Sequence, residues 1–291
     1  MITVALPNKG RLSEKALALF ERAGLRAEFT SERALVAGLG SDFRAIFVRA
    51  ADVPEFVADG AADVGVTGAD LVAESGREAD VETLLDLGFG RCRLAVAAPE
   101  ASGIQALAQV PAGSRVATSF PRVASAFFAR AGIPIELARV TGAAEIAPHL
   151  GIADVIVDLV STGSTLRVNG LREVVTVLES TARLIVSRSV WADGAAGKRA
   201  PLEELVAALE SVLRAERKRY LMANVPRDRL DDVRRVLPGI NGPTIVDVSD
   251  GGRWVAAHAV VDEDRVYQTI ASLKRLGAEG ILVTRIERLM P

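Results

Sequence analysis

The 291-residue sequence has few of the side chains that most enzymes use for nucleophilic or metal chemistry, with one cysteine and two histidines. A single thiol, Cys92, excludes an intrachain disulfide and is expected to be a small buried side chain. The only histidines are His149 and His258, so few residues are available to form a histidine-rich zinc site or a serine–histidine–aspartate triad. The sequence therefore does not favour a zinc-dependent hydrolase or an enzyme that uses a serine–histidine–aspartate triad.

Aromatic residues and net charge are also scarce, at 4% and −2. Neither a base-stacking surface nor a basic field indicates a nucleic-acid partner. No apolar run approaches the roughly 20 residues of a membrane span, and the first residues lack the basic and apolar regions of a signal peptide. We expect a cytoplasmic protein without a membrane or nucleic-acid partner, long enough for two or three domains.

What the sequence does contain is one organising stretch, residues 154–166 (DVIVDLVSTGSTL). The β-branched run at 155–157 is typical of a strand buried on both faces. A loop of backbone N–H and hydroxyl groups follows, and a helix is expected from about Leu166. Such a loop suits a phosphate, whereas Asp154 and Asp158 suit sugar hydroxyls or a hydrated Mg²⁺. A 5-phosphorylated ribose satisfies both halves, and a polar turn that binds nothing is the alternative. The loop residues are Ser161, Thr162, Gly163, Ser164 and Thr165.

Residues 158–166 (DLVSTGSTL) and 169–173 (NGLRE) resemble the phosphoribosyl-pyrophosphate loop of the ATP phosphoribosyltransferase family, which performs the first step of histidine biosynthesis. Residues 6–12 (LPNKGRL) are similar to that family's opening motif, and residues 62–71 (ADVGVTGADL) to its second nucleotide-site loop. The length and the C-terminal third resemble the long, self-regulated form. Phe120 stands where relatives often have a tyrosine, so any role of that hydroxyl is missing here.

The resemblance implies three sets of site residues. The catalytic set is Arg33, Arg49 and Asp158, with both guanidiniums stabilising the leaving pyrophosphate. Phosphoribosyl pyrophosphate would be bound by Glu145, Asp154, Asp158 and residues 161–165, and ATP by Lys9, Gly10, Arg11, Gly68 and Asp70. From the residues alone other interpretations stay open, because arginines often pair on the surface and acids often begin helices.

The alternation of β and α segments predicts an α/β fold with two lobes, like that of periplasmic binding proteins. Lobe I would span 1–90, completed by 181–218, and lobe II 91–180. Residues 192–200 are expected to form a flexible linker before an amphipathic helix. Residues 219–291 show the order βαββαβ, which predicts a ferredoxin-like (ACT-like) domain. The resemblance implies that this domain is regulatory and binds histidine through Asn224 and Thr244.

The reaction implied by the resemblance is transfer of the 5-phosphoribosyl group from phosphoribosyl pyrophosphate to N1 of ATP, with release of pyrophosphate. It also implies feedback inhibition by histidine, a homo-oligomer between dimer and hexamer, and Mg²⁺ held mainly through substrate phosphates. Two alternatives remain. A non-catalytic solute-binding protein would also have two lobes. Another phosphoribosyltransferase would have a similar loop, although the salvage enzymes carry two adjacent acids where Leu159 follows Asp158 here.

Overall fold

The computed structural model describes residues 1–31, 34–193, 197–248 and 251–290. The chain divides into two compact units, Met1–Val206 and Ala207–Pro291. The boundary falls inside helix α7 (Arg199–Ala215), whereas the sequence places the change of domain at residue 219. No helix in the described ranges is long and apolar enough to span a membrane.

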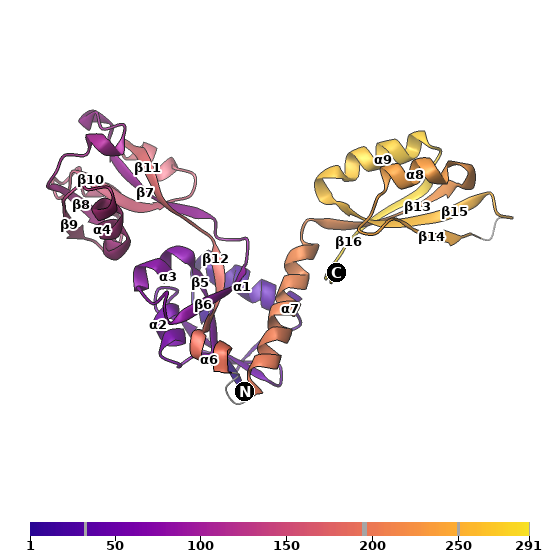
Figure 1. The fold of residues 1–291 in the computed structure, drawn as a ribbon, viewed down its shortest axis with the longest axis horizontal. Helices are drawn as coiled ribbons and strands as arrows, with labels where there is room; N and C mark the ends of the chain where they lie inside the picture. The colour runs from indigo at the N-terminus through magenta and orange to yellow at the C-terminus, as the bar shows by residue number, and fades with distance from the viewer. Residues whose placement is uncertain (32–33, 194–196, 249–250, 291) are drawn as a thin grey trace. The chain divides into compact units, whose positions relative to one another are not determined.

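Lobe I is built on a mixed seven-stranded sheet (Figure 1). Its central strand is buried along its whole length and pairs in parallel with both neighbours. Three parallel strands therefore end at one edge of the sheet, which is where α/β proteins bind ligands. The order is β2 (Ala27–Phe29), β3 (Val36–Leu39), β4 (Phe43–Val48), β1 (Ile2–Pro7), β5 (Val64–Gly68), β12 (Ala182–Ser187) and β6 (Val81–Asp86).

Lobe II is built on a five-stranded sheet. Strand β10 has Val155 and Val157 in one buried cluster and Ile156 and Val160 in another, which confirms a strand buried on both faces. The order is β11 (Leu171–Ser180), β7 (Cys92–Pro99), β10 (Val155–Val160), β8 (Ser114–Thr118) and β9 (Ile135–Arg139). Strand β12 follows β11 in the chain but belongs to the first sheet, so the chain crosses between the lobes twice and the two-lobed prediction is confirmed.

The helices of unit 1 follow the apolar spacing of the sequence. In α1, Ala16, Leu19 and Phe20 form the buried stripe, and Gly24 ends the turn with a φ of 88°. The helices are α1 (Gly10–Arg22), α2 (Val53–Ala58), α3 (Ala69–Ser75), α4 (Pro121–Arg130), α5 (Ser164–Val168) and α6 (Arg188–Asp193), with 3-10 turns at Glu100–Ser102, Leu107–Gln109 and Ala144–Ile146.

Two local predictions need correction. The helix after the organising loop begins at Ser164 rather than near Leu166, because Gly163 already adopts the left-handed conformation (φ 74°) that turns the chain. The expected linker at 192–200 is in part helical, since α6 continues to Asp193 and α7 begins at Arg199. Residues 194–196 lie outside the described residues.

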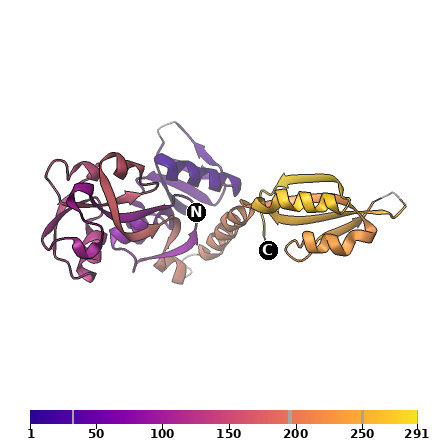
Figure 2. The ribbon, with the colours of Figure 1, turned by 90° about the horizontal axis from the view of Figure 1, so that it is seen from above.

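Unit 2 contains a four-stranded antiparallel sheet in the order β14 (Thr244–Asp247), β15 (Trp254–Asp262), β13 (Lys218–Pro226) and β16 (Glu279–Arg285). Figures 1 and 2 show α8 (Leu230–Val236) and α9 (Val266–Arg275) on one face of it. Short 3-10 turns, Arg227–Arg229 and Glu263–Arg265, precede these helices. The buried residues of β13 and β15 alternate with half-buried or exposed ones, as expected of a sheet covered on one side. The predicted ferredoxin-like order is confirmed.

Candidate active site

The loop after β10 presents backbone donors and hydroxyls. Within the described ranges, no acceptor is found for the N–H groups of Thr162 and Gly163. The Thr162 and Ser164 hydroxyl oxygens lie 2.9 Å apart. Gly163 has a φ of 74°, a conformation that favours glycine and turns successive N–H groups toward one side. The loop therefore has the composition and backbone geometry of an anion site.

Two carboxylates flank this loop. Asp158 is half-buried and its Oδ1 accepts a hydrogen bond from the Leu159 N–H at 2.8 Å. Burial raises the pKa of Asp158, the Leu159 N–H opposes that rise, and the nearby charge of Glu145 adds to it. Glu145 lies two residues after Ala143, which has a φ of 52° and is the one non-glycine residue with positive φ among those described. The charge of Glu145 disfavours ionisation of Asp158, and hydroxyl donors or a cationic centre would relieve this.

Asp154 does not lie beside the loop. Its Oδ2 accepts a hydrogen bond from the Arg115 N–H at 2.8 Å, at the start of β10. The strand is extended, with a rise of about 3.3 Å per residue, so its two ends are roughly 20 Å apart. The prediction that Asp154 contacts the ribose is wrong for this reason, and its carboxylate instead ties the start of β10 to β8.

The basic residues of lobe I lie at the sheet edge where the parallel strands end. Lys9 is the N-cap residue of α1, and Gly10 begins the helix with a φ of 78°. The Asn8 N–H donates to Val48 O at 2.8 Å, which joins the ends of β1 and β4. Arg49 comes directly after β4 and is exposed. The fold thus brings Lys9, Arg11 and Arg49 to one edge, whereas Arg33 lies outside the described residues.

Gly68 and Asp70 have a structural role that the sequence did not reveal. Asp70 is 4% exposed, its Oδ1 accepts a hydrogen bond from the Ser180 hydroxyl at 2.5 Å, and its N–H donates to the Ser180 hydroxyl oxygen at 3.1 Å. A Cβ at Gly68 would lie 2.2 Å from Asp70 Oδ1, so a larger residue there would have to displace the buried Asp70 carboxylate. These contacts join Asp70 to the crossing from β11 to β12, and its contact with ATP stays a prediction.

A cavity of about 670 Å³ faces the beginning of the loop. Its lining includes four cationic side chains and no carboxylate, so it is suited to a polyanion. The sequence missed Lys15, although Arg11 and Lys15 are four residues apart on one helix face, and it missed Arg91, for which no pattern is available. Arg49, Glu145, Asp158 and residues 162–165 do not line this cavity. The lining residues are Lys9, Gly10, Arg11, Leu12, Lys15, Gly88, Phe89, Gly90, Arg91, Cys92, Leu159 and Ser161.

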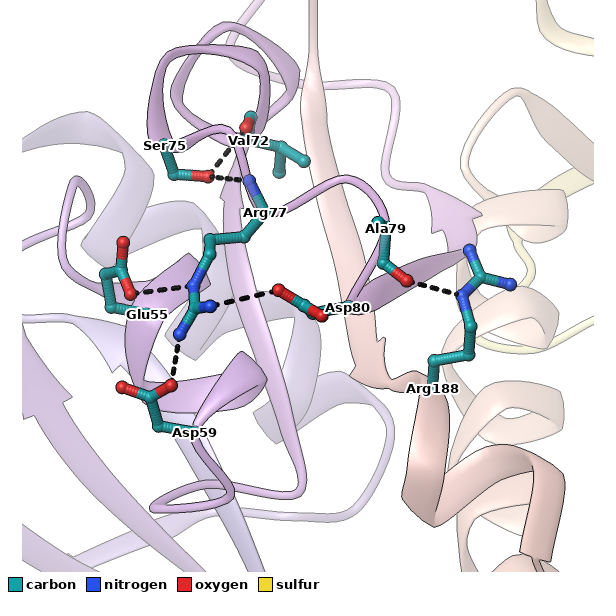
Figure 3. Close-up of polar contacts among 8 residues, drawn as sticks. All are labelled: Glu55, Asp59, Val72, Ser75, Arg77, Ala79, Asp80 and Arg188. Carbon is teal, nitrogen blue, oxygen red and sulfur yellow. Dashed lines mark hydrogen bonds and ion pairs between the residues drawn. The ribbon is translucent and has the colours of Figure 1, made fainter.

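Two arginines, Arg77 and Arg188, fasten the segment after α3 to lobe I (Figure 3). The Arg77 guanidinium donates to Glu55 at 2.9 Å and to Asp80 at 3.0 Å, and it also pairs with Asp59. The hydrogen bond to Glu55 and the surrounding carboxylates raise its pKa. Arg188 donates to Ala79 O at 3.0 Å on the other side of the same segment. The C-terminal end of α3 is thereby held in place beside lobe II.

Lobe I also supplies an acceptor to lobe II. Glu74 of α3 accepts hydrogen bonds from the N–H groups of Arg122 and Val123, each at 3.0 Å, in the first turn of α4. The N-cap residue of α4 is Phe120, which has no side-chain acceptor. Helix α4 is therefore capped by the other lobe, and this contact couples the two.

Taken together, the fold and the site define a class of protein, a two-lobed α/β protein with a cation-lined cavity next to a hydroxyl-rich loop. Two family models match the chain, "HisG: ATP phosphoribosyltransferase" over residues 49–211 and "HisG, C-terminal domain" over residues 215–288. The chain belongs to the ATP phosphoribosyltransferase family, and it is a pentosyl-transferring enzyme of the first step of histidine biosynthesis.

Curated relatives match over the whole chain. An ATP phosphoribosyltransferase of Gemmatimonas aurantiaca is 60% identical over 100% of both chains, and one of Methanocaldococcus jannaschii is 44% identical over 100% of both. A solved ATP phosphoribosyl transferase (HisG:HisZ) complex from Thermotoga maritima contains a chain that is 28% identical with a TM-score of 0.63, covering 72% of this chain and 99% of that one. These matches decide against a non-catalytic binding protein and against another phosphoribosyltransferase.

Proposed function

We propose that the two lobes divide the substrates of this reaction. Lobe II would hold the 5-phosphate of phosphoribosyl pyrophosphate on residues 161–165, and Asp158 and Glu145 would accept hydrogen bonds from the ribose hydroxyls. Lobe I would hold the ATP phosphates on Lys9, Gly10 and Arg11, with Lys15 and Arg91 added from the cavity. The observation that carries this division is the cation-lined cavity that reaches Ser161, next to the Thr162 and Gly163 N–H groups, for which the described residues supply no acceptor.

The reaction requires that the two substrates be aligned and that the charge growing on the leaving pyrophosphate be stabilised. N1 of adenine would attack C1 of the ribose as pyrophosphate leaves, through a transition state that resembles an oxocarbenium ion. Aligning two bound reactants supplies up to about 7–11 kcal/mol of the barrier reduction. A preorganised donor to the growing charge on pyrophosphate supplies about 2.7–4 kcal/mol, and we propose Arg49 and Arg33 for that role. Adenine N1 carries no proton, so no general base is required.

Mg²⁺ is proposed as the cofactor. In the part of the chain that the structure describes, no three histidine, cysteine or acidic side chains gather as a metal site. Two polyphosphates repel each other, and Mg²⁺ held by their oxygens would offset that repulsion together with the lysines and arginines. The metal would supply charge neutralisation of the departing pyrophosphate.

We further propose feedback inhibition by histidine bound to unit 2, in a homo-oligomeric cytoplasmic enzyme. Asn224 and Thr244 are both exposed and lie on the sheet face opposite α8 and α9. The attached C-terminal unit favours regulation within one chain, and the family's biosynthetic role favours the cytoplasm, where both substrates are made.

The experiment that tests this function is a steady-state assay of pyrophosphate release with ATP, phosphoribosyl pyrophosphate and Mg²⁺. Release should require all three components, and histidine should lower it. Pyrophosphate release at an equal rate without ATP would contradict the proposal, because it would indicate hydrolysis of the sugar diphosphate rather than transfer.

A further inference from the structure

Arg93, which belongs to none of the predicted sets, connects three segments of lobe II. Its guanidinium donates to Glu173 through two parallel hydrogen bonds, Nε to Oε1 at 2.7 Å and Nη2 to Oε2 at 2.6 Å. A third hydrogen bond joins Nη1 to the carbonyl oxygen of Ser161 at 3.2 Å. One side chain of β7 thus holds β11 and the first residue of the phosphate loop.

The backbone pattern explains why this arginine reaches so far. Arg93 lies opposite Val160, the last residue of β10, in the antiparallel ladder between β7 and β10. Ala95 and Ala97 share its face of β7, because side chains alternate along a strand. Both alanines are buried in the same cluster as Val160, and their small size leaves room for the arginine to lie along the strand. Glu173 pairs with Ala97 in the ladder, so it lies on the same face of the sheet as Arg93.

The contact with Ser161 fixes the orientation of one peptide group. In a trans peptide the C=O and the following N–H point in opposite directions, so holding Ser161 O on the guanidinium turns the Thr162 N–H the other way. A carbonyl oxygen turned into the loop would repel a phosphate, whereas an N–H attracts it. The paired hydrogen bonds hold the pKa of Glu173 below its usual value, so the acid stays ionised and anchors the arginine.

We propose that Arg93, anchored by Glu173, is a positioning residue that keeps the Thr162 N–H directed at the 5-phosphate of phosphoribosyl pyrophosphate. The inference rests on the proposed function, because it assumes that the loop holds this substrate. Arg93 acts through the Ser161–Thr162 peptide and contacts no reacting atom.

The test compares four full-length variants, Arg93→Gln, Glu173→Gln, the double variant, and Arg172→Gln as the control. Arg172 neighbours Glu173 on β11 and is exposed. Losing a hydrogen bond to a charged group corresponds to about 10- to 100-fold in an equilibrium constant. Arg93→Gln should weaken binding of phosphoribosyl pyrophosphate by that factor, measured by calorimetry and as KM, with the KM for ATP unchanged. Arg172→Gln should change neither.

The pair should act as a unit, so the double variant should be no worse than Arg93→Gln alone. Equal losses for both substrates, or additive losses in the double variant, would overturn the positioning role. If Arg93→Gln does not fold, Glu173→Gln and Arg93→Lys provide the same test, in which binding of phosphoribosyl pyrophosphate weakens while the KM for ATP is unchanged. If the wild-type enzyme releases pyrophosphate without ATP, the proposed function is overturned. If the wild type is active as proposed but Arg93→Gln binds phosphoribosyl pyrophosphate as tightly as the wild type, only this inference is overturned.

Discussion

Replacing Glu74 by alanine should destabilise unit 1 through loss of the cap that lobe I gives to lobe II. The two Glu74 oxygens each lie 3.0 Å from a backbone N–H in the first turn of α4. Phe120 offers no side-chain acceptor at that end, so the variant leaves both donors to water.

The expected magnitude follows from the type of contact. Loss of an N-cap acceptor costs about 0.5–2 kcal/mol, and because Glu74 accepts from two backbone N–H groups we expect about 1–2 kcal/mol. For a unit of this size, each kcal/mol shifts the unfolding midpoint by about 2–4 °C, so Tm should fall by about 2–8 °C. Glu74→Gln, which keeps one acceptor oxygen, should give a smaller fall.

The assay is differential scanning calorimetry of the full chain, with Glu78→Ala as the matched control. Glu78 is an exposed acid four residues further along, for which the described part of the chain shows no hydrogen bond or ion pair. Identical unfolding midpoints for Glu74→Ala and Glu78→Ala would refute the capping argument.

Three further predictions concern catalysis, pH and regulation. Arg49→Ala should lower kcat by about 10²–10³-fold with unchanged ATP binding, whereas equal loss of both would make Arg49 a binding residue. Because the pKa of Asp158 is raised in the folded protein, its stabilising effect is present in acid and is lost as pH rises through that pKa. Asp158→Asn should therefore raise Tm near neutral pH while lowering kcat/KM, and the Tm difference should vanish below the ordinary aspartate pKa of about 3.9. A neutral-pH Tm equal to wild type would contradict this. Asn224→Ala and Thr244→Ala should each raise the histidine concentration that halves the rate, and inhibition curves that match wild type would place the effector elsewhere.

Sequence reasoning succeeded where the signal is local. The β-branched run before Asp158 predicts its buried strand, and Gly163 predicts the turn that follows. The βαββαβ order of the C-terminal residues needs only the periodicity of successive segments. The error at Asp154 came from counting it as a near neighbour of the loop, although the chain between them is extended.

Contacts between residues far apart in the chain leave no recognisable pattern in a single sequence, so they could not be predicted. Asp70 meets Ser180 across 110 residues, and Arg93 meets Glu173 across 80. Such pairs depend on which strands become neighbours, so the sequence identifies the residue types at the site but not the side chains that hold them. Lys15 is the exception, since its helical spacing from Arg11 was readable.

The most direct test of the account is a crystal structure with phosphoribosyl pyrophosphate and Mg²⁺ bound. We expect the 5-phosphate within hydrogen-bond distance of the N–H groups of residues 162–165, and the ribose hydroxyls beside Asp158 and Glu145. A 5-phosphate bound instead by Lys9 and Arg11, with the loop left without it, would contradict the central claim.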